Sequence, residues 1–126
     1  MKEILYFLLF FLLTACFNFN PVLPESKLQV INSTKVMELA AERYQANEYN
    51  EALYYYTYAV KTFTNEIEVL AWANYEIGFI KYQQNKREEA IKYFDEVLKI
   101  NSPNPAPTIL AAQMKERLQK QLKKRK

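Results

Sequence analysis

The stretch NYEIGFIKYQQNKREEAIKYFDEVLKINS, residues 74–102, repeats the pattern of VMELAAERYQANEYNEALYYYTYAVKTFT, residues 36–64. Seven positions match in size or chemistry: Leu39 with Ile77, Ala40 with Gly78, Tyr44 with Tyr82, Asn47 with Asn85, Ala52 with Ala90, Tyr56 with Phe94, and Ala59 with Val97. In the second half of each segment the matched residues recur at i, i+4 and i+7, which is one stripe of a helix. Self-similarity of this kind indicates stacked pairs of helices.

The distribution of glycine and proline supports an all-α fold. Gly78 is the only glycine, and the prolines are confined to residues 21–24 and 103–107. The rest of the chain therefore lacks the residues that usually mark the turns between strands.

The repeated pattern resembles the tetratricopeptide repeat. In that family, small residues at the eighth and twentieth positions let two antiparallel helices approach closely, and an aromatic residue near the twenty-fourth position fills their crossing. The resemblance implies two helix-turn-helix repeats over residues 33–102. Residues 103–126 are then expected to form a capping helix with a basic tail, because a helix pair leaves an outward face to be covered.

The two repeats depart from the family pattern at several positions. Arg43, Asn74 and Lys81 stand where apolar or aromatic residues are usual, and Thr64 replaces the usual closing proline. The matched alanines lie 38 residues apart, against about 34 in the family. About four residues are therefore inserted around TFTNEIEV.

Helix ends are indicated in the second repeat. Asn85 followed by Glu88 predicts a helix start, with the asparagine side chain accepting from a free backbone amide. The run Asn101-Ser102-Pro103 predicts a helix end.

The amino-terminal residues have the features of a secretory signal. An apolar run over residues 4–13 follows Lys2, and it is shorter than the roughly 20 residues that a membrane-spanning helix needs. A signal peptide over residues 1–15 is therefore predicted.

A lipid anchor is predicted at the end of this segment. The sequence Leu13-Thr14-Ala15-Cys16 resembles the bacterial lipobox, whose cysteine receives a diacylglyceryl group and an amide-linked acyl chain such as palmitate. Cys16 would then be the first residue of the mature protein. The alternative is a signal peptide without lipid and a cysteine there by chance. In lipoproteins of this type an aspartate after the cysteine often signals inner-membrane retention, and Phe17 here favours the outer membrane, facing the periplasm.

Residues 17–32, FNFNPVLPESKLQVIN, have no clear helical period and contain two prolines. They are predicted to form a flexible tether between the lipidated residue and the repeats, so that residues 16–32 make up the anchor segment. The alternative is an ordered arm in which Phe17, Phe19 and Val22 pack against the repeats.

The composition argues against an enzyme. Histidine is absent and Asp95 is the only aspartate, which removes the commonest general base and metal ligand. No glycine-rich phosphate loop is present. We therefore expect no catalytic residue, no cofactor and no metal site. One cysteine leaves no partner for an intramolecular disulfide.

A stripe of aromatic residues is the candidate partner-binding groove. In tetratricopeptide repeats the first helix of each pair lines a groove that holds peptides or partner helices, and here that helix carries Trp72, Tyr75, Phe79 and Tyr82. The alternative is that the capping helix folds over the stripe and buries it. Of the tyrosines in the preceding helix, Tyr55 and Tyr58 are expected near the surface.

Basic residues concentrate at the carboxyl end. Residues 115–126 carry a net charge of +6, so the rest of the chain is acidic. The basic tail comprises Lys120, Lys123, Lys124, Arg125 and Lys126. It is interpreted either as a solvated helix end or as a contact for anionic headgroups or an acidic protein. No nucleic-acid partner is predicted for an exported chain.

The anchor, the short tether and the repeats together resemble the BamD family of outer-membrane assembly lipoproteins. The resemblance lies in AERYQANEYNEAL, residues 41–53, and KYQQNKREEAIKYFDEVLKIN, residues 81–101. It implies a non-catalytic, membrane-anchored scaffold that works with a BamA-like barrel insertase. The family typically has about five repeats and this chain has two. Alternatives are an adaptor that recruits cell-wall enzymes or peptides, and a surface lipoprotein that contacts a host. The oligomeric state stays open.

Overall fold

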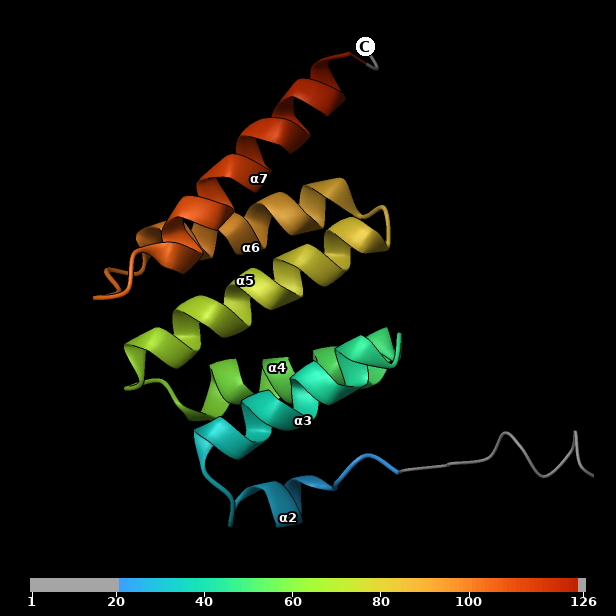
Figure 1. The fold of residues 1–126 in the computed structure, drawn as a ribbon, viewed down its shortest axis with the longest axis vertical. Helices are drawn as coiled ribbons and strands as arrows, with labels where there is room; N and C mark the ends of the chain where they lie inside the picture. The colour runs from blue at the N-terminus through green and yellow to red at the C-terminus, as the bar shows by residue number, and fades with distance from the viewer. Residues whose placement is uncertain (1–20, 125–126) are drawn as a thin grey trace, which may run out of the picture.

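The computed structural model describes residues 21–124, and this range is helical without a strand. Its helices are α2 (Glu25–Leu28), α3 (Ser33–Gln45), α4 (Tyr49–Thr62), α5 (Ile67–Gln83), α6 (Arg87–Lys99) and α7 (Ala106–Lys123). They stack in chain order from α2 at one end to α7 at the other (Figure 1). The predicted fold class, two helix pairs followed by a capping helix, is confirmed.

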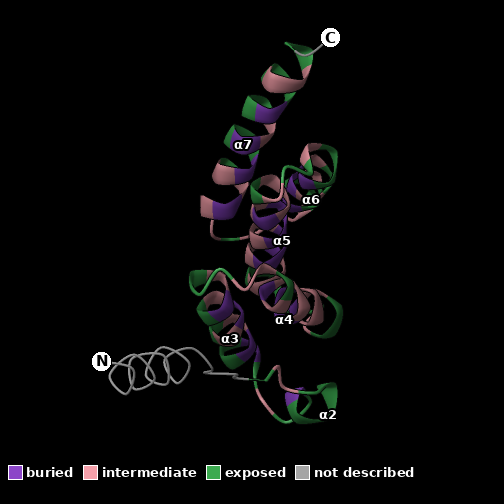
Figure 2. Cartoon of the chain, turned by 90° about the vertical axis from the view of Figure 1, so that its right-hand side faces the viewer, coloured by how far each residue is buried: buried purple, intermediate pink, exposed green. Residues whose placement is uncertain are grey.

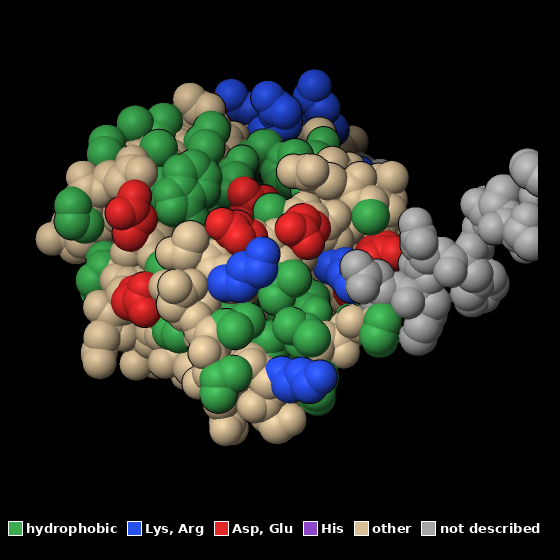
Figure 3. Space-filling model, turned by 60° about the horizontal axis from the view of Figure 1, so that its bottom comes forward, with side chains coloured by type: hydrophobic (Ala, Val, Ile, Leu, Met, Phe, Trp, Pro, Cys, Tyr) green, Lys and Arg blue, Asp and Glu red, His purple; other side chains and the backbone are tan. Residues whose placement is uncertain are grey.

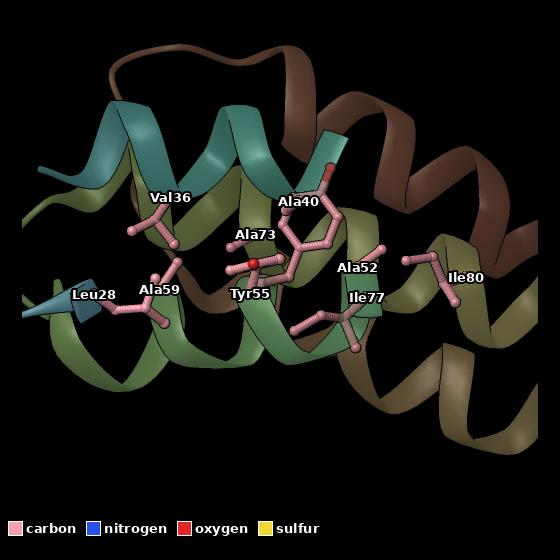
Figure 4. Close-up of a cluster of buried hydrophobic side chains, with 10 residues drawn as sticks. Leu28, Val36, Ala40, Ala52, Tyr55, Ala59, Ala73, Ile77 and Ile80 are labelled. Carbon is pink, nitrogen blue, oxygen red and sulfur yellow. The ribbon is translucent and has the colours of Figure 1, made fainter. Parts of the chain in front are cut away.

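Small residues set the spacing within each pair. Ala40 and Ala52 are fully buried between α3 and α4, in a cluster that continues onto α5 (Figure 4). In the second pair, a Cβ atom on Gly78 would lie 2.8 Å from the Phe94 ring. The close approach that the repeat pattern predicts is therefore present in both pairs.

The last helix covers the second pair. Pro107, Ala111, Met114 and Leu118 of α7 are buried, at a spacing of i, i+4, i+7 and i+11 that places them on one side of the helix. Their partners in the second core cluster are Ala90, Phe94 and Val97 of α6. Figure 2 shows buried residues along one side of α7 and exposed residues along the other, as expected of a cap.

The two asparagines at equivalent turns have the same unusual backbone. Asn47 has φ 61° and Asn85 has φ 62°, each just after the first helix of its pair. This left-handed conformation lets the backbone amide of Lys86 donate to the Lys81 carbonyl at 2.9 Å, which satisfies a free carbonyl at the helix end. The prediction that Asn85 starts a helix was wrong: it lies in the turn after α5, and Lys86 is the residue before α6.

The polar residues at usually apolar positions have partners. Arg43 pairs with Glu48 at 2.7 Å, and Lys81 pairs with Glu89 at 2.9 Å. The side-chain amide of Asn74 donates to the Leu70 carbonyl one turn earlier, at 2.8 Å. These partners let polar groups stand at buried positions without an unmet hydrogen bond.

The residues inserted between the repeats lengthen α5. This helix has 17 residues, whereas α3 has 13. By the 38-residue repeat spacing, Ser33, the first residue of α3, corresponds to Ala71. Helix α5 begins at Ile67, four residues before Ala71. The insertion is therefore about one extra helical turn at the start of α5.

Residues 21–31 pack against the first repeat, so the flexible tether predicted over residues 17–32 is wrong for this part. The amide of Leu23 donates to the Tyr55 hydroxyl at 2.8 Å, and the Tyr54 hydroxyl donates to the Leu23 carbonyl at 3.1 Å. Leu28 is fully buried, and Val22 packs against the same core cluster. We call residues 21–31 the arm; it covers the free side of the first pair.

The position of Tyr55 corrects a second expectation. Its side chain is fully buried beneath the arm, although it was predicted near the surface, while Tyr58 is half-buried. The arm supplies both the cover and the hydrogen-bond donor that a buried hydroxyl needs.

The signal peptide, the lipobox with Cys16, and residues Phe17 and Phe19 lie outside the described residues, as do Arg125 and Lys126. Within residues 21–124, the helices are too short or too polar to cross a bilayer.

Candidate partner-binding groove

The four predicted groove residues lie together along one side of α5. Trp72, Tyr75, Phe79 and Tyr82 are each half-buried. Successive ring centroids are 5.9, 6.2 and 6.0 Å apart, within the range of favourable aromatic contact. The stripe is therefore one continuous aromatic surface.

The stripe is not equally open along its length. Three of its rings pack against the core cluster that α6 and α7 form, namely those of Tyr75, Phe79 and Tyr82. The ring centroids of Tyr75 and Phe94 are 5.8 Å apart. Trp72 instead lines a groove at the other end of the stripe. Three rings thus pack against the core cluster, and Trp72 lines the groove.

The groove has a volume of about 720 Å³ and lies between α3 and the first turns of α5. Its lining residues are Thr34, Met37, Glu38, Ala41, Glu66, Ile67, Glu68, Val69, Trp72 and Pro103. The sequence prediction missed the residues of α3. A signal was present, since Thr34, Met37 and Ala41 precede Trp72, Tyr75 and Phe79 by the 38-residue repeat spacing.

Hydrogen bonds fix one rim of the groove. The Ser33 hydroxyl, at the start of α3, donates to the Glu66 carboxylate just before α5. The Asn104 side-chain amide, just before α7, donates to the Glu68 carboxylate at 2.9 Å. These two hydrogen bonds therefore connect the start of α5 to the start of α3 and to the loop before α7.

A further carboxylate lies one turn beyond Trp72. Glu76 is half-buried, and burial raises the pKa of its carboxyl group. Burial and then the Glu76 charge also raise the pKa of Tyr56 and of Tyr75. Within residues 21–124, Glu76 forms neither an ion pair nor a side-chain hydrogen bond.

The described part of the basic tail is exposed. Lys120, Lys123 and Lys124 lie on the surface of α7, and Lys120 pairs with Glu116 at 2.6 Å within the same helix. Closer to the core, Lys115 joins α7 to Asp95 of α6 at 2.6 Å. Among the described residues, the carboxylate side chains form no group that could hold a metal ion.

Residues 71–104 match the tetratricopeptide-repeat family. The fold is an all-α repeat fold, and the stretch that matches the family comprises most of α5, all of α6 and the residues that follow α6. The match begins at Ala71, so the extra turn of α5 lies just before the matched tetratricopeptide repeat. No curated protein matches the chain. Tetratricopeptide repeats generally bind protein partners and are generally non-catalytic scaffolds, which agrees with a groove lined by aromatic and aliphatic side chains.

Proposed function

We propose that the protein is a non-catalytic scaffold that holds a segment of a protein partner in the groove between α3 and α5. The observation that carries this proposal is the position of Trp72 in the groove beside Met37 and Ile67. Ile67 is 43% exposed, so the groove presents apolar surface to solvent. Tryptophan is among the residues most enriched at binding hot spots, and an open apolar surface of this kind is typical of an interaction site.

We further propose that the scaffold is anchored in the outer membrane through Cys16 and serves as an accessory subunit of the β-barrel assembly machinery. This proposal is supported by the lipobox-like sequence at residues 13–16, by the likeness to tetratricopeptide repeats, and by the residues inserted between the two repeats, which form the extra turn of α5. The partner would then be the periplasmic part of a BamA-like insertase.

Affinity capture from gently solubilised membranes, followed by mass spectrometry, tests the proposal. The unaltered chain is expected to recover a barrel insertase in comparable amount, and Trp72→Ala is expected to lose it. Tyr58→Ala, an aromatic truncation on α4 outside the groove, is the matched control. Recovery of cell-wall enzymes would replace the assembly role by a general adaptor role. Equal capture by both variants would contradict the groove as the binding site.

The anchor is tested separately with Cys16→Ser. The unaltered chain should incorporate labelled palmitate and remain with the membrane, and the variant should lose the label and be released. Labelling that persists in Cys16→Ser would rule out this cysteine as the lipid site.

A further inference from the structure

The extra turn of α5 gives the groove a chemical character that the repeat alone does not. Ile67, Glu68 and Val69 lie on this turn and Glu66 directly before it, and all four line the groove. With Glu38 of α3, the lining contains three carboxylates and neither lysine nor arginine. The inserted residues therefore build an end of the groove that is both apolar and acidic.

We propose that this acidic end of the groove selects a partner segment that carries lysine or arginine next to apolar side chains. The inference rests on the proposed function, because it assumes that the groove holds a protein segment. To the proposed function it adds the positive charge of the bound segment, and it assigns the recognition of that charge to Glu38, Glu66 and Glu68.

The local hydrogen bonds position two of these carboxylates without neutralising them. Glu66 accepts from a serine hydroxyl and Glu68 accepts from an asparagine amide, both of which are uncharged donors. Neither donor carries a positive charge, and both hydrogen bonds fix the place of the carboxylate at the rim. Fixed charges of this kind attract a cation at low cost in side-chain entropy.

Glu38 can also bind a basic side chain of a partner, although it already forms an ion pair within α3. Its described ion pair is with Lys35 at 3.1 Å, and both side chains are about half exposed, at 49% for Lys35 and 56% for Glu38. An exposed pair one turn apart contributes at most about 1 kcal/mol. A basic side chain from a partner can therefore replace Lys35 at little cost.

The remaining lining suits the rest of such a segment. Trp72 offers an aromatic face, the type of ring that attracts cations most strongly. Met37, Ile67 and Val69 offer apolar surface for neighbouring side chains. Figure 3 shows carboxylates and hydrophobic side chains side by side on one face, with lysine and arginine side chains between them and at its upper edge.

The basic tail of a second copy is the competing occupant. Its described part, residues 120–124, offers little apolar surface: Leu122 is half-buried, and Leu118, one turn earlier, is fully buried against α6. The exposed lysines of the described tail, Lys120, Lys123 and Lys124, therefore have little apolar surface beside them. The structure therefore favours a segment from a different protein.

The fluorescence of Trp72, the only tryptophan in the chain, reports directly on the groove. The full chain in mild non-ionic detergent is titrated with a short synthetic peptide of leucine and lysine, and with the same peptide in which glutamate replaces lysine. We expect the lysine peptide to shift the emission with an affinity that falls as salt is raised, and the glutamate peptide to leave it unchanged.

Charge-neutral variants identify the residues responsible. Glu38→Gln combined with Glu68→Gln should weaken binding of the lysine peptide by about tenfold or more. Glu96→Gln combined with Glu116→Gln removes the same charge from exposed sites on α6 and α7 and should leave the affinity within about twofold.

Three results would overturn the inference: binding of both peptides with equal affinity, binding unaffected by the Glu38 and Glu68 substitutions, or self-association that is lost when Lys120, Lys123 and Lys124 are changed to glutamine. The last result would make the occupant a second copy. Capture of a partner that depends on Trp72 but not on Glu38 and Glu68 would preserve the proposed function and refute this inference alone.

Discussion

Gly78 lies where α5 crosses α6, and its missing side chain sets how closely the two helices approach. The equivalent position in the first repeat is Ala40, whose methyl group is fully buried. The difference comes from the ring of Phe94, which occupies the space that a Cβ atom on Gly78 would need.

Gly78→Ala should destabilise the protein. Alanine favours a helix over glycine by up to about 1 kcal/mol, but overpacking a filled core costs about 1–3 kcal/mol. The net loss, measured by urea unfolding, is expected to be on the order of 1 kcal/mol. In combination with Phe94→Leu, the added methyl group should cost less than it does alone, which a double-mutant cycle measures. A gain in stability from Gly78→Ala alone would contradict the close contact with Phe94.

Asn85 tests the left-handed turn. Replacing it with alanine should cost on the order of 1 kcal/mol, because a Cβ atom disfavours this conformation and asparagine tolerates it better, whereas glycine should be neutral or stabilising. Chemical denaturation of the two variants provides the measurement. Asn50→Ala, at an exposed position within α4, is the control and should be slightly stabilising. Equal stability of the alanine and glycine variants at position 85 would argue against positive φ there.

Glu76 predicts a pH dependence. Burial raises the pKa of its carboxyl group in the folded state, so the folded protein binds more protons than the unfolded chain between the two pKa values. The contribution of Glu76 to the free energy of unfolding therefore falls as the pH rises through that interval, and it stays lower above it. Glu76→Gln should raise the melting temperature at pH 7.5 but not at pH 4. A melting temperature that falls at pH 7.5 would show that the charge is compensated.

At the scale of the elements, the arm and α5 show what the sequence does and does not predict. The insertion is visible from the repeat spacing, but the spacing does not reveal that the inserted residues form a helical turn, or that Ser33 and Asn104 donate hydrogen bonds to its carboxylates. The arm has no helical period to detect. It is held by hydrogen bonds between Leu23 and the hydroxyls of Tyr54 and Tyr55, which lie about thirty residues away in the chain, so a local pattern carries no sign of it.

Tyr55→Phe tests the attachment of the arm. The change removes the acceptor for the Leu23 amide and should cost about 1–2 kcal/mol. Hydrogen exchange of residues 21–31 should accelerate more than exchange in α5 and α6. Tyr58→Phe, a half-buried tyrosine on the same helix, serves as the control and should leave the arm unchanged. Unaltered exchange at Leu23 in Tyr55→Phe would contradict the hydrogen bond.

For the whole molecule, two repeats are enclosed by a cover at each end, the arm on the first pair and α7 on the second. The periodic parts, the repeats and the final helix, were predictable because each has a helical stripe. The groove was only half predictable. Its aromatic side is a stripe on one helix, whereas its apolar and acidic end combines residues from α3, the inserted turn and the loop before α7.

Leu118→Ala tests the dependence of the repeats on the final helix. Leu118 is fully buried, and truncating such a side chain costs about 2–5 kcal/mol. The midpoints reported by circular dichroism and by Trp72 fluorescence should fall together, because nearest-neighbour contacts couple the pairs. Leu122→Ala, a half-buried position one turn later, should cost less. A fluorescence midpoint that stays unchanged would show that the first pair and the groove fold independently of α7.

The docked arm also bears on how the protein would be presented at a membrane. The five chain steps from Cys16 to Pro21 span at most about 18 Å, and the described structure begins with the arm at Pro21 rather than with α3 at Ser33. With a lipid on Cys16, the end of the stack that carries α2 would therefore be held close to the bilayer. The anchored scaffold would then have lost much of its rotational freedom before it meets a partner in the same membrane. This loss lowers the entropic cost of their association.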